Sequence, residues 1–236
     1  MKLALIPARG GSKRIPRKNI RPFCGTPIIG YSIRAALDCG AFDRVLVSTD
    51  DAEIAAVARE FGAETPFMRP PELANDHVGT LPVIKHAIER LNAGGAAVEL
   101  ACCIYATAPF VRATDLLAGL DALSASDADY AFGVTSFPYP IHRALRILPN
   151  DRVQMFQPGN YFRRSQDLEE AYHDAGQFYW GRAAAYLRQA PFFLSAALPV
   201  MLPRHRVQDI DTLEDWGRAE LMYKAWQLQD GGHATQ

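Results

Sequence analysis

The chain has 236 residues, of which 49% are hydrophobic and 22% charged, and its formal net charge is −1. This balance is typical of a globular protein with a substantial core and excludes a disordered or collagen-like chain. Near-neutrality excludes wholesale attraction to nucleic acid or anionic membrane, and no apolar run approaches the ~18 residues of a membrane span.

The first predicted element is a short buried strand that runs straight into a glycine-rich turn. The strand is Lys2–Ile6, and the turn reads Pro7-Ala8-Arg9-Gly10-Gly11-Ser12-Lys13. The apolar run is too short for a signal peptide. Glycines let the backbone approach a ligand closely, and successive N–H groups in such a turn form an anion-binding concavity. The spacing is neither that of a Walker loop nor that of a dinucleotide motif, so it predicts a third kind of phosphate-binding loop.

The basic residues concentrate in the same region. Residues 1–37 contain eight Lys and Arg and no Asp or Glu, and six of these cations lie between Arg9 and Arg21. The rest of the chain carries 17 basic and 26 acidic residues. A dense cationic loop on a near-neutral protein indicates a local anion site, and a solvated basic surface loop is the alternative.

Predicted strands and helices alternate along the rest of the chain. The strands are expected at 44–48, 100–105, 131–137 and 178–180, with a short extended segment at 66–68. The helices are expected to begin at Asp51 and to span 79–91, 112–123 and 212 to about 228, the last opening on a Thr212–Asp215 capping box. This alternation predicts a three-layer α/β domain with a mostly parallel sheet and a ligand at the carboxyl ends of its strands.

Residues 138–175 interrupt the alternation. They are rich in Pro, Arg, Tyr and Gln and lack helical periodicity. An excursion of this length inside a compact domain indicates a lid or a partner-binding arm. We therefore expect a single domain over residues 1–229 that carries this arm, followed by a frayed tail at 230–236.

The cysteine pattern bears on the compartment. Cys24, Cys39, Cys102 and Cys103 have neither the spacing of a zinc site nor that of a disulfide framework. They read as reduced thiols used as small apolar residues, so a cytoplasmic location is expected.

Two carboxylates near the other end of the chain are the second chemical signal. Asp209 and Asp211 stand two residues apart, and in an extended segment such side chains project to the same face. Mg²⁺ is usually held by one or two carboxylates together with substrate phosphates. Such pairs are common, and this one could simply precede the Thr212 cap. With a phosphate-binding loop in the same chain, it predicts a magnesium site.

Several segments along the chain carry a resemblance to a known family, in which they occur in the same order. They are 6–20, 48–54, Arg69-Pro70 with Leu73 and Asp76, 107–109, and 209–211. Together they resemble the signature of the acylneuraminate (CMP-sialic acid) cytidylyltransferases over almost the whole chain. The resemblance implies a nucleotide-diphospho-sugar transferase-like fold with an inserted dimerisation and sugar-binding arm, and hence a homodimer. It also implies a reaction in which CTP and a nine-carbon 2-keto sugar acid give the CMP-sugar and pyrophosphate.

The segments that contact the sugar depart from typical sialic acid enzymes. Tyr105 stands where those enzymes often have Gln, and residues 165–168 and 171–179 lack their Arg and Asn-Gly pair. With 102–109 and 172–176, the chain resembles the branch of the family that activates pseudaminic acid for surface or flagellar glycosylation. N-acetylneuraminate, legionaminate and 3-deoxy-octulosonate are the alternative sugars, and a non-catalytic nucleotide-binding or nucleic-acid-binding module is the alternative of another class.

The resemblance also implies roles for single residues on the nucleotide side. The CTP-binding residues are expected to be Ala8, Arg9, Gly10, Gly11, Ser12, Lys13, Asn19 and Arg69. Arg9, Lys13, Lys18 and Asp211 are expected to be catalytic, with Lys18 near the α-phosphate. Asp209 and Asp211 are expected to hold Mg²⁺, and either Asp211 or a hydroxide on the metal takes the proton of the attacking hydroxyl. For Arg69 a surface salt bridge is the alternative role.

On the sugar side, three residues are expected to line the pocket: Tyr105, His173 and Gln177. The alternatives are a core aromatic for Tyr105 and a hydrogen-bonded loop histidine for His173. The candidates for binding the sugar carboxylate are the arginines of the arm, Arg143, Arg163 and Arg164, some of which could serve a neighbouring subunit.

Overall fold

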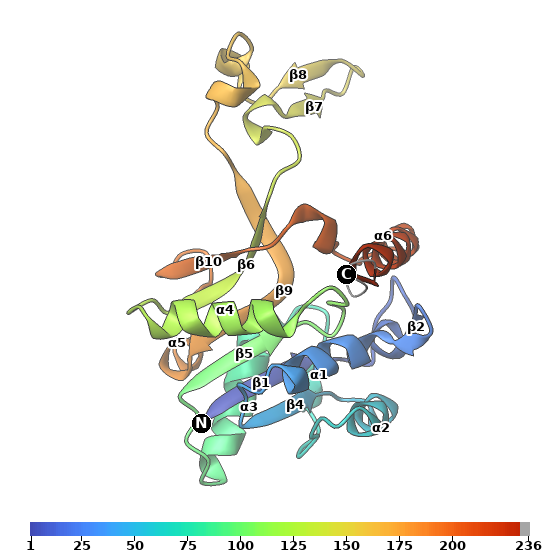
Figure 1. The fold of residues 1–236 in the computed structure, drawn as a ribbon, viewed down its shortest axis with the longest axis vertical. Coiled ribbons are helices and arrows are strands. Elements are labelled where there is room, and N and C mark those ends of the chain that lie inside the picture. Colours follow the sequence, from blue (N-terminus) through green and yellow to red (C-terminus); the bar gives the residue numbers. More distant parts are fainter. Residues whose placement is uncertain (232–236) are drawn as a thin grey trace.

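The computed structural model describes residues 1–231, which form a six-stranded sheet with the order β10-β6-β9-β5-β1-β4 (Figure 1). Its strands are β1 (Lys2–Pro7), β4 (Arg44–Ser48), β5 (Leu100–Ile104), β6 (Tyr130–Ser136), β9 (Tyr172–Arg182) and β10 (Ala197–Met201). β1 pairs in parallel with β4 and β5, and β10 with β6, whereas β9 runs antiparallel to β5 and β6. The predicted mostly parallel sheet is therefore confirmed, with one reversed strand.

Helices cover both faces of this sheet. They are α1 (Ile28–Asp38), α2 (Ala52–Glu60), α3 (Thr80–Ala93), α4 (Ala113–Ser124), α5 (Ala183–Leu187) and α6 (Leu213–Gly231). Apolar side chains of α1, α2 and α4 pack in one buried cluster, and those of α3 and α5 pack in another on the opposite face. A third, smaller cluster joins α6 to the segment around Phe23. The three-layer prediction is confirmed.

The central strand shows why the layers form. Ala4 and Ile6 of β1 belong to one cluster, Leu3 and Leu5 belong to the other, and all four are fully buried. A strand covered on both faces needs an unbroken apolar run, which is what the sequence has here. Each buried Leu or Ile contributes about 1.5–3 kcal/mol relative to an exposed one, so this strand forms the centre of the core.

Three elements differ from the expectation. α1 and β10 were not predicted, and β9 is much longer than the expected 178–180. Gly30 lies within α1, where it lowers helix propensity, but a Cβ there would come within 2.5 Å of the Phe61 ring. In β9, Gly176 at φ 63° and the polar side chains before it hide the strand pattern. Close packing at Gly30 thus explains why α1 was not predicted, and the irregularity at Gly176 explains why β9 was predicted too short.

The remaining short elements are hairpins and 3₁₀ turns. The strands are β2 (Pro22–Phe23), β3 (Thr26–Pro27), β7 (Leu145–Ile147) and β8 (Val153–Met155). The 3₁₀ turns are η1 (Lys18–Ile20), η2 (Pro71–Leu73), η3 (Ile141–Arg143), η4 (Pro158–Asn160), η5 (Ser165–Asp167) and η6 (Arg204–Arg206).

The expected excursion is an arm that projects from the body. It leaves the sheet at the end of β6, forms the β7–β8 hairpin and returns at the start of β9 (Figure 1). We call residues 137–171 the arm. α6 continues through Gly231, two residues beyond the expected domain end, and residues 232–236 of the expected tail lie outside the described residues. Among residues 1–231, no helix is long and apolar enough to cross a membrane.

Candidate active site

The glycine-rich turn starts at the carboxyl end of β1, in the middle of the sheet. The Ala8 N–H donates to the Ser48 carbonyl at 2.9 Å, which joins the turn to the end of β4. The Gly10 N–H donates to Asp50 Oδ1 at 3.0 Å, and a Cβ on Gly10 would lie 2.7 Å from Asp51 Oδ2. A Cβ on Gly11 would meet no atom within 4 Å. Gly10 is therefore required by packing against Asp51, whereas a side chain at Gly11 would meet only open space.

One of the six cations has a structural task. Arg17, in the left-handed region at φ 55°, donates to both Asp51 oxygens at 2.5 and 3.0 Å. This hydrogen bonding lowers the pKa of Asp51 to about 2. Asp51 also accepts from the backbone N–H groups of Glu53 and Ile54 and so caps α2. Arg17 is therefore committed to anchoring the loop.

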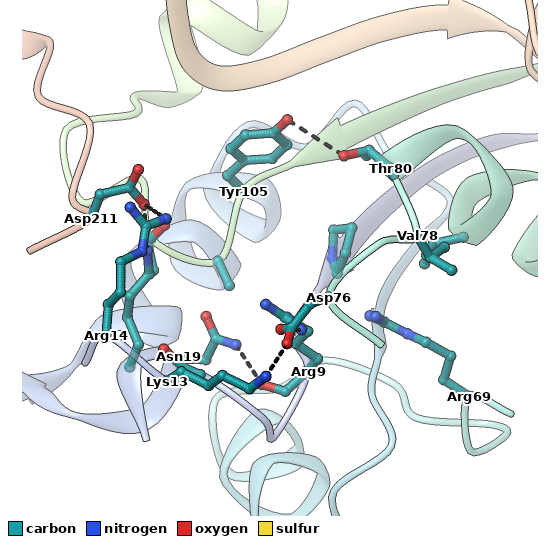
Figure 2. A pocket seen from close by; sticks show the side chains of 17 residues that line it. Arg9, Lys13, Arg14, Asn19, Arg69, Asp76, Val78, Thr80, Tyr105 and Asp211 are labelled. Carbon is teal, nitrogen blue, oxygen red and sulfur yellow. Dashed lines mark hydrogen bonds and ion pairs between the residues drawn. The ribbon is translucent and has the colours of Figure 1, made fainter. Parts of the chain in front are cut away.

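Four other cations of the loop, Arg9, Lys13, Arg14 and Lys18, border a cavity of about 510 Å³, which we call the first cavity (Figure 2). Of the residues predicted for the nucleotide, those lining it are Arg9, Ser12, Lys13, Lys18, Asn19 and Arg69. Asp211, predicted for the metal, lines it too. Ala8, Gly10 and Gly11 are not among the lining residues, and Ala8 is fully buried. The side chains predicted for the nucleotide are thus brought together from separate parts of the chain.

Asp76 lies between two of these cations. Its carboxylate forms ion pairs with Arg9 and, at 2.5 Å, with Lys13 (Figure 2). Hydrogen bonds from Lys13 and then Arg9 lower the pKa of Asp76 to about 2. An anion is therefore already held where Arg9 and Lys13 converge, which demonstrates that the two side chains can share one negatively charged group.

Arg69 borders the first cavity on the side away from Arg14 and Asp211 (Figure 2). Its guanidinium is 5% exposed and donates to the Ser48 carbonyl and to Ser48 Oγ at 3.1 Å. Among residues 1–231, no carboxylate lies within ion-pair distance of it, so the surface salt bridge is not its role. Burial lowers the pKa of Arg69 to about 10, which leaves a cation at neutral pH. A buried cation that forms no direct ion pair with a carboxylate, and that lies beside a cavity, favours an anionic ligand there.

The acidic pair meets the basic loop, as predicted. Arg14 Nη2 lies 2.9 Å from Asp211 Oδ1, and Lys18 Nζ lies 3.5 Å from the same oxygen. Lys18 also donates to the backbone carbonyl of Ile210. Residues almost 200 positions apart in the sequence are therefore in direct contact. Partial burial, and then repulsion by Asp211, raise the pKa of Asp209.

The donor set of the pair is compatible with magnesium. Among the described residues, no group of three or more His, Cys, Asp or Glu side chains forms a closed metal site. Asp211 lines the first cavity and Asp209 the second, and Asp211 repels Asp209. A pair of carboxylates of this kind is nevertheless the open donor set that Mg²⁺ uses when phosphate oxygens complete its shell. Asp209 and Asp211 fit that requirement.

A second cavity of about 670 Å³ lies next to the first. Its side-chain lining includes three residues predicted for sugar or metal, Tyr105, His173 and Asp209. Tyr105 lines both cavities, so the two meet at its ring. The arginines that line the second cavity, Arg204 and Arg218, were not predicted. Their closeness in sequence to Asp209 and Asp211 was the available signal.

The arm arginines lie elsewhere. Arg143 donates to Ser165 Oγ at 3.4 Å, Arg163 to the Asp167 carbonyl at 2.6 Å, and Arg164 pairs with the Asp167 carboxylate at 2.8 Å. None of the three lines either cavity. Because the arm projects away from the body, the prediction that they line the site of their own chain is not supported.

Gln177 also differs from its predicted role. It is 3% exposed and lines neither cavity. Its backbone carbonyl accepts from the Tyr105 N–H at 2.9 Å, and its side-chain Nε2 donates to the backbone carbonyl of Arg206 at 2.5 Å. Gln177 therefore joins the end of β5, which carries Tyr105, to the segment that leads to Asp209.

Comparisons with known proteins identify the family to which the chain belongs. Residues 3–215 match the family model described as cytidylyltransferase. A pseudaminic acid cytidylyltransferase from Campylobacter jejuni is 44% identical over 222 residues, which cover 94% of this chain and 96% of that protein. An N-acylneuraminate cytidylyltransferase from Oncorhynchus mykiss is 35% identical over 219 residues, covering 92% and 49%. The solved structure of CMP:2-keto-3-deoxy-manno-octonic acid synthetase complexed with CTP has a TM-score of 0.70 at 17% identity, covers 95% and 98%, and shows a shared fold.

Proposed function

The chain belongs to the cytidylyltransferase family, and from that premise we propose that it transfers CMP from CTP to pseudaminic acid and releases pyrophosphate. The observation that carries the proposal is the contact of Arg14 and Lys18 with Asp211 at the edge of the first cavity, next to a second cavity that Tyr105 shares. The 44% identity to the pseudaminic acid enzyme of Campylobacter jejuni supports the choice of sugar.

The first cavity is the proposed CTP site. Arg9, Ser12 and Lys13, which line it, would receive the triphosphate, and Asp76 would give up its two cations to it. Arg69 would reach the nucleotide through its planar fork, which suits phosphate or ribose oxygens. Nucleotidyl transfer depends mostly on positioning and on stabilising negative charge, and this set of cations supplies both.

Transfer would take place where the two cavities meet. The anomeric hydroxyl of the sugar acid attacks the α-phosphorus, a new oxygen–phosphorus bond forms, and the bond to the pyrophosphate oxygen breaks. Lys18 would stabilise charge on the α-phosphate, and Asp211 would accept the hydroxyl proton. Asp209 and Asp211 would hold Mg²⁺, which neutralises phosphate charge when bound.

The second cavity is the proposed sugar site. The sugar acid carries a carboxylate, and the arginines lining this cavity are Arg204 and Arg218. Arg218 also pairs with Glu214 at 3.0 Å on the exposed side of α6. We therefore assign carboxylate recognition to Arg204 and Arg218 in place of the arm arginines.

The arm is the proposed dimerisation element. It exposes a set of apolar side chains that includes Tyr139, Leu145, Ile147, Val153, Phe156, Tyr161 and Phe162. An exposed apolar patch of this extent marks a protein–protein interface. A second copy of the chain is the proposed occupant, and its arm would bring Arg143, Arg163 or Arg164 towards a neighbouring site.

The proposed location is the cytoplasm, and the proposed destination of the product is a surface or flagellar glycan. All four cysteines are free thiols, and Cys102 and Cys103 are fully buried, which suits a reducing compartment.

The test is pyrophosphate release from CTP and Mg²⁺ with pseudaminic, legionaminic, N-acetylneuraminic and 3-deoxy-octulosonic acids supplied separately, with the products identified by mass spectrometry. We expect turnover with pseudaminic acid and a mass that corresponds to its CMP conjugate. Turnover with N-acetylneuraminic acid alone would overturn the assignment of the sugar. CTP binding without turnover on any sugar acid would overturn the assignment as an enzyme.

A further inference from the structure

The second cavity contains a carboxylate that would repel the acid group of the proposed sugar. Asp174, near the start of β9, lines this cavity and is half-buried. The other carboxylate in the lining, Asp209, is the proposed metal ligand, and Arg204 and Arg218 are the proposed partners of the sugar carboxylate. A negative charge in a pocket for an anion weakens binding, unless it contacts a different part of the ligand.

Uncharged donors hold both oxygens of Asp174. Oδ1 accepts from the Gly176 N–H at 3.0 Å, and Oδ2 accepts from the Tyr179 hydroxyl. Within residues 1–231, no Lys or Arg forms an ion pair with this carboxylate. A carboxylate only accepts hydrogen bonds and has about four acceptor positions. Two donors therefore leave Asp174 able to accept further hydrogen bonds from a ligand in the cavity.

The surroundings of Asp174 fix its position. Its backbone is paired with Val134 of β6, and its carbonyl accepts from His173 Nδ1 at 2.9 Å. The tyrosine that donates to it, Tyr179, is 1% exposed, and its ring stacks on that of Phe192 with 4.7 Å between the centroids. The carboxylate is thus oriented before a ligand arrives, which reduces the entropy lost on binding.

The local structure does not require the negative charge. The bond from the Gly176 N–H to Asp174 Oδ1 closes an Asx turn, which asparagine forms as well as aspartate does. The amide nitrogen of an asparagine could donate to the oxygen of Tyr179. Because a neutral amide would satisfy both neighbours, the charge and the purely accepting character of Asp174 point to a ligand that brings hydrogen-bond donors.

We propose that Asp174 is a specificity residue of the sugar site, which accepts a hydrogen bond from an N–H or O–H group of the sugar that lies away from the sugar's own carboxylate. Tyr179 is a positioning residue that holds Asp174. The proposal rests on the proposed function and deepens its sugar site. In pseudaminic acid, the donors are the acetamido N–H groups and the hydroxyls. A sugar acid that covers Asp174 without a donor would leave a desolvated carboxylate unsatisfied.

The first test is steady-state kinetics of Asp174→Asn with CTP and pseudaminic acid. We expect the KM for the sugar acid to rise about tenfold, because a hydrogen bond to a charged acceptor is lost, while the KM for CTP stays within about twofold. Asp129→Asn is the matched control. Asp129 is also half-buried, pairs with Arg188 at 2.5 Å and lines neither cavity, so we expect both KM values to be unchanged.

The second test removes single donors from the sugar acid. Analogues with acetoxy in place of acetamido lack an N–H, and deoxy analogues lack an O–H. With the wild-type enzyme, one analogue should lose about tenfold in kcat/KM, and with Asp174→Asn the same analogue should lose less than about threefold, because its partner is already gone. The analogue that responds in this way identifies the donor. A purely structural role of Asp174 would lower kcat/KM for every analogue by the same factor.

The outcomes separate this inference from the proposed function. If the wild-type enzyme turns over no sugar acid, the proposed function fails. If it turns over pseudaminic acid, the inference alone is wrong when Asp174→Asn leaves the KM for the sugar unchanged. It is also wrong when that KM falls, as expected if the charge only repels the sugar carboxylate, or when every analogue keeps its wild-type loss.

Thermal unfolding reports whether Asp174→Asn folds. If it does not, a crystal structure of the wild-type enzyme with CMP-pseudaminic acid decides. A nitrogen or oxygen of the sugar within about 3.2 Å of the Asp174 carboxylate is the expected result. A sugar that makes no such contact would overturn the proposal.

Discussion

At the residue scale, the cations of the basic loop have different partners and therefore different tasks. Arg17 is bound to Asp51 and holds the loop to α2, whereas Lys18 contacts Asp211 and the carbonyl of Ile210. The density of charge in the sequence predicts an anion site, but it does not distinguish these tasks. Only the partners in the folded chain identify which cations face the first cavity.

Lys18→Met is expected to lower kcat about 100- to 1,000-fold, because it removes a preorganised cation from the proposed α-phosphate position. The measurement is pyrophosphate release at saturating CTP and sugar acid. Lys85→Met is the control, since Lys85 pairs only with Glu89 on α3, and we expect it to leave kcat unchanged. A Lys18→Met enzyme within threefold of the wild type would contradict the assigned role.

Asp76→Asn is expected to tighten CTP binding by up to about fivefold, because a partly exposed carboxylate no longer competes with the triphosphate for Arg9 and Lys13. Isothermal titration with CTP measures the effect, and Asp121→Asn on α4 serves as the control. If CTP binding weakens in Asp76→Asn, the carboxylate helps to hold the two cations in place and does not occupy the position of the ligand.

At the element scale, a buried ion pair fixes the segment that carries the acidic pair. Arg206 of η6 donates to both oxygens of Asp115 on α4, at 2.5 and 3.0 Å, and both residues are more than nine-tenths buried. Asp115 also accepts from the N–H of Arg112 at the start of α4. Gln177 also donates to the Arg206 carbonyl. These two contacts fix the position of the segment that leads from Arg206 to Asp209.

Arg206→Met is expected to lower the free energy of unfolding by about 3–5 kcal/mol, because it leaves a buried carboxylate without its partner. Urea denaturation measures the change. The double variant Arg206→Met with Asp115→Asn should recover part of the loss, since the unpaired charge is gone. Asp115→Asn is measured alone as well. If the loss in the double variant equals the sum of the losses in the two single variants, the two side chains do not act as a pair.

The elements that the sequence predicts best are those with uninterrupted periodicity. The helices α2, α3, α4 and α6 follow their apolar spacing and caps, and Asp215 accepts from Thr212 as the capping box requires. α1 was not predicted because it contains Gly30, which is needed for close contact with Phe61. β10 was not predicted because only its pairing with β6 defines it as a strand.

At the site, the basic loop and the acidic pair could be predicted from the chemistry of neighbouring residues in the sequence. The direction of the arm, and hence the position of Arg143 and Arg164, depends on tertiary structure.

At the scale of the whole molecule, the arm leaves apolar side chains without a covering surface in a single chain. Ile147 is 77% exposed and Phe162 is 92% exposed. Ile147 belongs to β7, which lies at the far end of the arm from the sheet (Figure 1). Burial of such side chains in a second copy would remove a large apolar area from water, which favours a stable dimer.

Ile147→Glu combined with Phe162→Glu is expected to convert the dimer to a monomer, because charged groups would have to be buried in the interface. Sedimentation velocity over a concentration series measures the mass. The control is Leu221→Glu, which places the same charge on an equally exposed apolar position of α6, outside the arm. A wild-type chain that sediments as a monomer at all concentrations would rule out the proposed dimer.

We propose that the basic loop and the acidic pair together bind one polyphosphate and its divalent ion. A crystal structure of the protein with CTP and Mg²⁺ tests this most directly. We expect the triphosphate in the first cavity, with Arg9 and Lys13 moved from Asp76 onto its oxygens and the metal between the phosphates and Asp209 and Asp211. A triphosphate bound outside this cavity, or a metal held without either aspartate, would show that the loop and the acidic pair do not share one ligand.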